Sequence, residues 1–431
     1  MTHAVEETVQ PCPQCGDTIR SDARFTTWCT GCDWNVDPAA PDPHTGRVER
    51  ARRTLARRHG ERLLGELTAG GASSTREARP VAARRDTASV AALALALAVH
   101  AVTLAFAAVG AWMLVTGWGH TWRLIGAVVL LAVAWTLRPR FRKLPDDRPV
   151  LYRESAPALF ALVDEVAAVA GTRGVDAVVL DLQVNASVTT YGIRGRRLLN
   201  LGIPLWEMLG PRERVALLGH ELGHFGNGDT RHGVIVAQAL RSLDTWRYFV
   251  AAAPRPTPLE AVLNLLRLPP RMLVTGVMLL LDGLTLRAAQ RAEYLADTMA
   301  ARAASTDAAV RLMDLLLVAA SAEGMLRREA NARQVTSHAL DADGLWGRLA
   351  AHTRSVPERE YERLRRVGVR RGHSVDSTHP PTHLRRSLLT AGEPLAAAVR
   401  VDTARDEAVS GELSAARARL ARELLRDGVG S

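Results

Sequence analysis

The longest apolar stretch of the chain is Thr87–Leu137, in which Arg123 is the only formally charged residue. It is long enough for two helices of about 20 residues, the length that crosses the hydrocarbon core of a bilayer. Gly117–His120 (GWGH) supplies a turn between them. A buried hairpin of a soluble domain is the alternative, but such a long, nearly uncharged stretch is uncommon there. We therefore predict a transmembrane hairpin with helices over Ser89–Thr116 and Trp118–Leu137.

The residues around this hairpin predict its orientation. Three tryptophans lie near the turn and Trp135 lies at the other end, as in an aromatic belt at two membrane surfaces. Basic residues flank the hairpin on both outer sides: Arg76, Arg79, Arg84, Arg85, Arg138, Arg140, Arg142 and Lys143. The turn carries only Arg123. By the positive-inside rule both ends of the hairpin face the cytoplasm, which predicts a multi-pass protein of the cytoplasmic membrane.

Beyond Leu144 the pattern becomes that of a folded domain. SAPALFALVDEVAAVAG (155–171) has the spacing of an amphipathic helix. The segment 177–205 reads as short strands with turns at Gly192 and Gly195. After Pro211 the pattern is mostly helical to the end of the chain. This predicts an α+β, mostly helical domain that contains a small sheet.

All four cysteines lie near the N-terminus, in two C-x-x-C pairs: Cys12, Cys15, Cys29 and Cys32. Four thiolates close a tetrahedral structural zinc site, so the spacing predicts a four-cysteine zinc ribbon. Four free cysteines or a redox pair are the alternatives. The clustering disfavours a disulfide scaffold. MTHAVEETVQ at the N-terminus has no basic segment followed by an apolar run, so we expect no cleavable signal peptide.

The next segment is a Pro-rich linker followed by a basic helix from Arg47 to about Leu67, which reads as a solvated or membrane-surface helix. The net charge of the chain is +10, and Lys143 is its only lysine. Such an arginine bias often reflects genomic base composition, so nucleic acid is not an expected partner. A basic surface near anionic lipid fits the charge equally well.

LLGHELGHFGNGD (217–229) carries two histidines four residues apart on a predicted helix. Residues i and i+4 share a helix face, so His220 and His224 can bind one ion, while Glu221 can reach a water beside it. A catalytic zinc needs a third protein ligand. In the pattern HExxHxxGxxH, Asn227 stands here in place of the glycine and Thr230 in place of the third histidine, which excludes that class.

The remaining source of a ligand is an acidic residue on another helix. In LRAAQRAEYLADTMAA, Glu293 and Asp297 lie four residues apart among apolar side chains. Glu293 can bind the zinc, and Asp297 can accept a hydrogen bond from a ligand histidine and so fix its tautomer. A solvated helix face is the alternative for such a pair taken alone.

GHELGHFGNGD, AEYLAD and STHPPTHLRRSLL together resemble the HtpX-type integral-membrane zinc metalloproteases, gluzincins related to the CaaX prenyl endopeptidase and to Oma. The resemblance covers residues 151–389. It implies a zincin-like metallopeptidase domain that cleaves polypeptides. It also implies that His220, His224 and Glu293 bind the catalytic Zn²⁺ and that Glu221 is the general base.

The resemblance implies further site residues. His379 and Arg385 match a histidine and an arginine that lie near the site in this family, where a donor group can stabilise an oxyanion. Asn185 and Ala186 match the edge strand beside the cleft, to which a substrate can add by backbone pairing. Ser187 stands where family members often have an aromatic residue.

The chain also departs from the family. HtpX-type proteins carry a second hydrophobic hairpin between their zinc motifs, but here Gly233–Ala253 contains three charged residues. Met272–Leu286 is short for a span and contains Asp282. The number of membrane helices is therefore two or four. The N-terminal zinc ribbon is an addition to the family's plan.

Together with the resemblance, these patterns predict a membrane-bound zinc endopeptidase with one catalytic and one structural Zn²⁺. By analogy with the family, the resemblance implies membrane or misfolded proteins as its substrates. Its site faces the cytoplasm, and its ribbon can bind a protein partner. The alternative is a non-catalytic membrane adaptor or sensor whose ribbon binds a partner or nucleic acid. The predicted parts are a zinc ribbon (1–37), a linker with a basic helix (38–87), the hairpin (88–138), the peptidase domain (145–392) and a charged helical tail (393–431).

Overall fold

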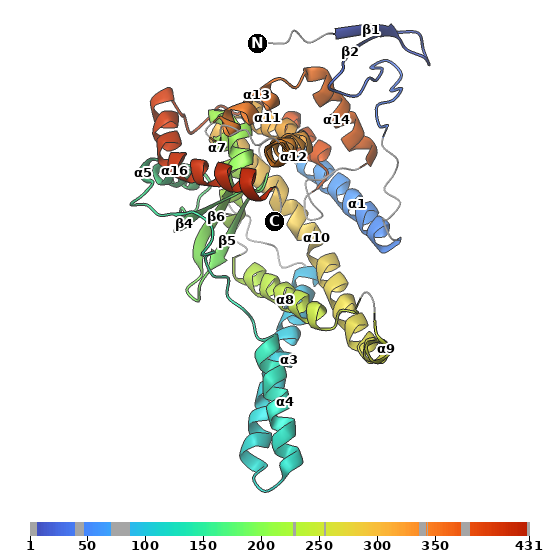
Figure 1. Ribbon diagram of the computed structural model, residues 1–431, viewed down its shortest axis with the longest axis vertical. Helices are drawn as coiled ribbons and strands as arrows, with labels where there is room; N and C mark the ends of the chain where they lie inside the picture. The colour runs from blue at the N-terminus through green and yellow to red at the C-terminus, as the bar shows by residue number, and fades with distance from the viewer. Residues whose placement is uncertain are drawn as a thin grey trace. The chain divides into compact units, whose positions relative to one another are not determined.

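The computed structural model describes residues 7–38, 47–69, 87–226, 230–253, 256–335, 342, 344–371 and 380–428. The described chain is mostly helical with two small sheets, as the sequence predicts (Figure 1). It forms two compact units. The first comprises residues 1–78, 144–226 and 290–431, and the second comprises residues 79–143 and 227–289.

The larger sheet of the first unit has four strands. Their order is β3 (Val150–Leu151), β4 (Ala177–Asp181), β6 (Arg196–Gly202) and β5 (Ala186–Tyr191). β4 and β6 are parallel, whereas β5 and β6 form an antiparallel hairpin. Gly192 and Gly195 in its turn have φ of 66° and 59°, a conformation that glycine adopts without strain. The predicted strands and turns are confirmed, and β5 is an edge strand.

Helices form most of the first unit, together with the last part of α10 (Leu268–Ala304). They are α1 (Arg47–Ala69), α5 (Pro157–Val169), α6 (Ile203–Met208), α7 (Pro211–Gly226), α11 (Thr306–Leu317), α12 (Ala319–Val335), α13 (Leu345–Arg354), α14 (Glu358–Arg371), α15 (Thr382–Ala391) and α16 (Thr403–Asp427). Apart from α1, whose Leu63 packs in a smaller cluster with Tyr294 and Leu384, these helices pack apolar side chains in one core with the sheet. The C-terminal helix α16 buries Leu413, Leu420 and Leu424 in that core, so it is an integral part of this unit.

Two glycines let α7 pack closely against α10. A Cβ atom at Gly219 would lie 3.0 Å from Ala300 Cα, and one at Gly223 would lie 3.0 Å from Ala296 Cα. These are tighter than ordinary van der Waals contacts, and the opposing atoms belong to backbone. The two helices therefore approach each other through glycine on one side and alanine on the other.

The N-terminal residues form a small hairpin of β1 (Glu7–Pro11) and β2 (Thr18–Asp22) next to the cysteines. The following turn lies against the arginines of α14. Arg363 donates to Val36 O (2.9 Å), and Arg366 donates to Thr30 O (2.7 Å) and Asp33 (2.6 Å). The ribbon therefore binds an arginine-rich face of its own chain.

The second unit contains α3 (Thr87–Thr116), α4 (Thr121–Leu137), α8 (Thr230–Phe249), α9 (Pro258–Leu266) and the first part of α10. α3 and α4 run side by side as a helical hairpin, as predicted (Figure 1). Small residues line their contact: a Cβ atom at Gly110 would lie 2.9 Å from Leu131. Large apolar side chains of the hairpin are exposed, among them Leu104, Trp112, Val115, Trp122, Val128 and Trp135.

Two described helices, α3 and α10, are long and apolar enough to cross a membrane. α4 is also apolar but has only 17 residues. The sequence reading treated Met272–Leu286 as a short segment. The structure shows that it lies inside the continuous helix α10 of 37 residues, which the local charge pattern did not reveal.

Gly219→Ala tests the close approach of α7 and α10. The added methyl group would meet the backbone of Ala300, so we expect a loss of about 1–3 kcal/mol in the free energy of unfolding and a lower Tm. Gly411→Ala is the matched control, because Gly411 is exposed on α16 and its Cβ would meet nothing within 4 Å. That variant should gain up to about 1 kcal/mol from helix propensity. Equal stabilisation of both variants in thermal unfolding would contradict the close packing.

Candidate metal centre

Helix α7 presents the two histidines of HExxH on one face. It begins at Pro211, a favourable first helical residue, with Glu213 in its first turn. His220 is 5% exposed and His224 is partly exposed, so the pair lies at the edge of the core. Their Nε2 atoms are 3.3 Å apart. The helix therefore brings together two imidazole nitrogens at the spacing of two ligands.

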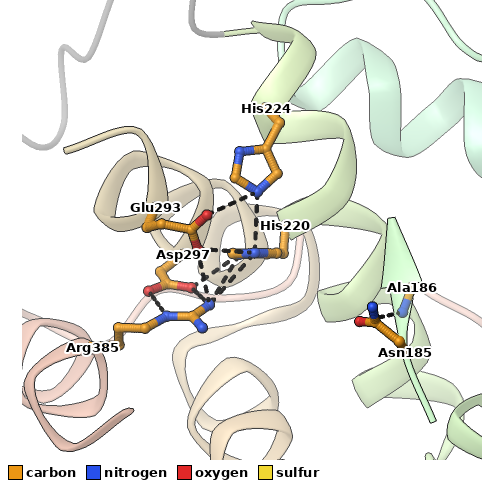
Figure 2. Close-up of polar contacts among 7 residues, drawn as sticks. All are labelled: Asn185, Ala186, His220, His224, Glu293, Asp297 and Arg385. Carbon is orange, nitrogen blue, oxygen red and sulfur yellow. Dashed lines mark hydrogen bonds and ion pairs between the residues drawn. The ribbon is translucent and has the colours of Figure 1, made fainter. Parts of the chain in front are cut away.

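Glu293 on α10 completes a triangle of donor atoms (Figure 2). Its carboxylate oxygens lie 3.6 Å from His220 Nε2 and 3.5 Å from His224 Nε2. A tetrahedral zinc with bonds of about 2.0–2.2 Å separates its ligand atoms by roughly 3.3–3.6 Å. Two neutral imidazoles and one carboxylate are also a known donor set for catalytic zinc. The residues fit the metal that the sequence predicts.

Asp297 lies one turn after Glu293 and is fully buried. Its Oδ1 is 3.0 Å from His220 Nδ1, so Nδ1–H donates to this carboxylate. The opposite ring nitrogen, Nε2, then keeps its lone pair and faces His224 and Glu293. Asp297 thus selects the tautomer that a metal ligand needs and orients the ring.

Arg385 on α15 forms a two-pronged pair with Asp297 (Figure 2). Its Nε and Nη2 donate to the two carboxylate oxygens at 2.8 and 2.6 Å, and the side chain is 2% exposed. Burial opposes the charged form of Asp297, but the charge and hydrogen bonds of Arg385 outweigh it and hold the pKa of Asp297 well below its usual range. Asp297 is therefore always a charged acceptor for His220.

Negative groups surround Arg385 in return. Burial opposes its charge, yet the carboxylates of Asp297, Glu293 and Glu221 raise the pKa of Arg385 above its usual value. Arg385 Nη2 is 3.8 Å from Glu293 Oε2. The resemblance implies that Arg385 is an oxyanion donor. In the structure, two of its three guanidinium nitrogens donate to Asp297.

Helix α1 packs against α10, the helix that carries Glu293. Tyr294 is fully buried, and its hydroxyl donates to Gly60 O at 3.1 Å. Gln290 Nε2 donates to Ala56 O at 2.8 Å. Leu63 joins Tyr294 in a small apolar cluster. The sequence reading of α1 as a solvated or membrane-surface helix was therefore wrong for this face, which anchors the residues on both sides of Glu293.

The structure brings some of the expected residues together and leaves others apart. Glu221 is buried on α7 between the two histidines. Asn185 and Ala186 lie at the start of edge strand β5, beside α7 rather than among the ligands (Figure 2). His379 lies outside the described residues. Sequence reasoning missed Gly219 and Gly223, although their places directly before the two histidines were a signal of close helix approach.

The cysteine cluster also fits a metal. Cys12 Sγ lies 3.6 Å from Cys32 Sγ, and Cys15 Sγ lies 3.6 Å from Cys29 Sγ. All four sulfurs lie within 4.8 Å of one another, whereas a tetrahedral zinc thiolate site separates sulfurs by about 3.8 Å. Four thiolates leave no open coordination position. This cluster fits the predicted structural zinc ribbon.

Comparison with known proteins agrees with this geometry. A family model described as peptidase family M48 matches residues 155–392, more than half of the chain. The match contains α7, Glu293, Asp297 and Arg385. Searches of curated proteins and of solved structures find no match to this chain.

Glu293→Ala tests the third ligand. Two histidines alone do not make a catalytic zinc site, so we expect zinc measured by mass spectrometry to fall from two ions per chain to the one in the ribbon. Cys29→Ser should show the reverse pattern and lose only the ribbon ion. Glu323→Ala removes an acid from α12 outside the cluster and should keep both. Two zinc ions in Glu293→Ala would assign the third ligand elsewhere.

Asp297→Asn tests the support of His220. The variant removes the charge that fixes the histidine tautomer, so we expect a loss of about 10–100-fold in zinc affinity. It also leaves Arg385 buried without its charged partner, which should cost about 3–5 kcal/mol of stability. Zinc affinity is measured by competition with a chromogenic chelator, and stability by chemical unfolding of the metal-free protein. Unchanged values for both would contradict the buried pair.

Proposed function

The chain belongs to peptidase family M48, and from that premise we propose that it is a membrane-bound zinc endopeptidase with a zincin-like domain over residues 145–392. The observation that carries the proposal is the triangle of His220, His224 and Glu293, with Asp297 behind it. Family membership alone supports a metallopeptidase. The donor triangle supports the finer proposal that these three residues bind a catalytic zinc.

When bound, zinc polarises a carbonyl oxygen and lowers the pKa of a water to about 7. Glu221 acts as general base: it takes the proton from the attacking water and passes it to the leaving amine. Its place on α7, next to the buried face that holds the histidines, supports this role. Arg385 and His379 support the developing oxyanion, and Arg385 Nη2 lies 3.8 Å from Glu293 Oε2, next to the donor triangle.

The substrate binds as an added strand. β5 pairs only with β6 among the described strands, so its outer edge offers backbone groups to an extended peptide. Asn185 and Ala186 stand where this edge begins. Asn185 Oδ1 accepts from the Ala186 amide at 2.9 Å, which fixes the backbone at that point. Backbone pairing of this kind accepts many sequences, as proteolysis of misfolded proteins requires.

The protein resides in the cytoplasmic membrane. The exposed apolar side chains of α3 and α4 and the length of α10 support insertion in a bilayer. Four basic residues follow α4, whereas the turn carries Arg123 alone, which supports a cytoplasmic site and N-terminus. Membrane or misfolded proteins near the cytoplasmic surface are therefore the proposed substrates, and the role is protein quality control.

The zinc ribbon serves its own peptidase unit in this proposal. Asp33 forms ion pairs with Arg366 at 2.6 Å and Arg370 at 2.7 Å, and Arg366 also lies over the ring of Trp28. A face that is occupied in this way does not bind nucleic acid or a partner. Recruitment of a protein partner would use the remaining ribbon surface. These contacts disfavour the alternative of an adaptor built around the ribbon.

Glu221→Gln tests the mechanism. The variant keeps the shape of the side chain and all three ligands but removes the base, so peptide cleavage should fall by about 10²–10⁴-fold while zinc content stays at two ions per chain. Cleavage is measured on casein and on membranes that express either protein, by comparative proteomics. Proteins that accumulate with the variant are the substrates.

Glu323→Gln, on α12 away from the ligands, is the matched control and should cleave like the wild type. A chelator should abolish the cleavage by both active forms. Wild-type cleavage rates in Glu221→Gln would reject the mechanism, whereas inactivity of the wild type on every peptide would favour the adaptor.

A further inference from the structure

A pocket of about 520 Å³ lies in the second unit, apart from the metal centre. The segment after α4 contributes Arg138 and Arg140, helix α8 contributes Arg241 and Ser242, and α10 contributes Asp282. The proposed peptidase chemistry gives the pocket no task. We call it the arginine pocket.

Positive charge is in excess in the arginine pocket. Arg241 donates to the uncharged Gln238 Oε1 at 2.7 Å, and Arg138 lies over the ring of Trp135 at 3.4 Å. Among the described residues, no ion pair with a carboxylate joins Arg138, Arg140 or Arg241. Partial desolvation, and then the like charge of Arg142, lower the pKa of Arg241, a residue that keeps an exposed surface. An anion in the pocket would relieve this repulsion.

Two carboxylates also line the pocket and contribute to its net charge. Asp244 is paired with Arg247 at 2.8 Å, a residue outside the lining, so its charge is already balanced. Asp282 is half-buried on α10 and has an interaction of its own. Three arginines against the one remaining carboxylate leave a net positive site.

Ser242 is the second, independent sign of a ligand. Its side chain is 4% exposed, it lines the pocket, and its hydroxyl has no hydrogen-bond partner among the described residues. A buried hydroxyl without a partner costs about 1–3 kcal/mol, so such groups are normally satisfied. Guanidinium groups and a neutral hydroxyl donate hydrogen bonds to the oxygens of a phosphate group.

The place of the pocket identifies the source of the phosphate. Trp135 is exposed at the end of apolar helix α4, and Arg138 and Arg140 follow it directly. Tryptophan at the end of a span lies at the level of lipid headgroups. Basic pockets between membrane helices on the cytoplasmic side bind acidic headgroups.

We propose that the arginine pocket binds the phosphate headgroup of an acidic phospholipid, held by Arg138, Arg140, Arg241 and the Ser242 hydroxyl. This inference rests on the proposed membrane location and is independent of the peptidase chemistry. A bound lipid would tie α4, α8 and α10 together, because the pocket takes residues from all three segments.

The test is native mass spectrometry of the full-length protein in detergent with added phosphatidylglycerol or phosphatidylcholine. We expect a saturable adduct with phosphatidylglycerol and a much weaker one with phosphatidylcholine. Ser242→Ala removes one hydrogen bond to a charged group without changing net charge, and should weaken phosphatidylglycerol binding about tenfold. Arg241→Gln, at an exposed position where folding is not at risk, should weaken it at least as much.

Arg123→Gln is the matched control, because it removes the same charge from α4 near its first residue, at the end away from the pocket, and should bind lipid like the wild type. Equal binding of both lipids would overturn the proposal that the arginine pocket selects an acidic headgroup. Equal losses of lipid affinity in Arg123→Gln and Arg241→Gln would overturn it as well. Displacement by inorganic phosphate at the lipid's concentration would assign a soluble phosphate instead and overturn the lipid source. Flotation with phosphatidylcholine vesicles reports separately on membrane insertion, so a failure there would reject the membrane location.

Discussion

The candidate site depends on the close approach of α7 and α10. Gly219 and Gly223 each precede a histidine of the candidate metal centre, and both face alanines of α10, whose Cα atoms would lie 3.0 Å from an added Cβ. Because the side chains at these positions are so small, His220 and His224 come within reach of a short carboxylate side chain on the facing helix. A larger residue at either glycine would separate the helices and open the triangle of donor atoms. Glycine is therefore required here for proximity, although it lowers the intrinsic stability of a helix.

Charged groups stabilise the arrangement of side chains that this close packing allows. Asp297 accepts from His220 on one side and from Arg385 on the other, and it has no exposed surface. A buried ion pair need not increase stability relative to an apolar core, but removal of one partner is costly. Without Arg385, Asp297 would be a buried charge that lacks its ion-pair partner, so the position of α15 also stabilises the acceptor of His220. Backbone carbonyls of helix α1 accept hydrogen bonds from the uncharged side chains of Gln290 and Tyr294.

The two units have different surfaces, which fits a first unit in water and a second unit in contact with lipid. The first buries most of its large apolar side chains in a main core, and arginines of α14 bind the ribbon. The second exposes leucine, valine and tryptophan along α3 and α4 and gathers arginine where α4 ends. The peptidase chemistry lies in the first unit, and the lipid contact that we propose lies in the second. Among the described helices, α10 contributes residues to both units.

The sequence by itself determined the features that depend on local spacing. These are the helix that bears His220 and His224, the paired acids Glu293 and Asp297, the cysteine turns, the strand hairpin and the apolar helices. Each follows from periodicity or from ligand geometry within a few residues. Only the tertiary structure decided what distant segments do to one another. Arg385 pairs with Asp297 through two nitrogens, and α1 packs against Tyr294. The ribbon contacts α14, and Met272–Leu286 is part of a long helix. Such contacts join residues far apart in the chain, and no local pattern of polarity encodes which partner a buried polar group will find.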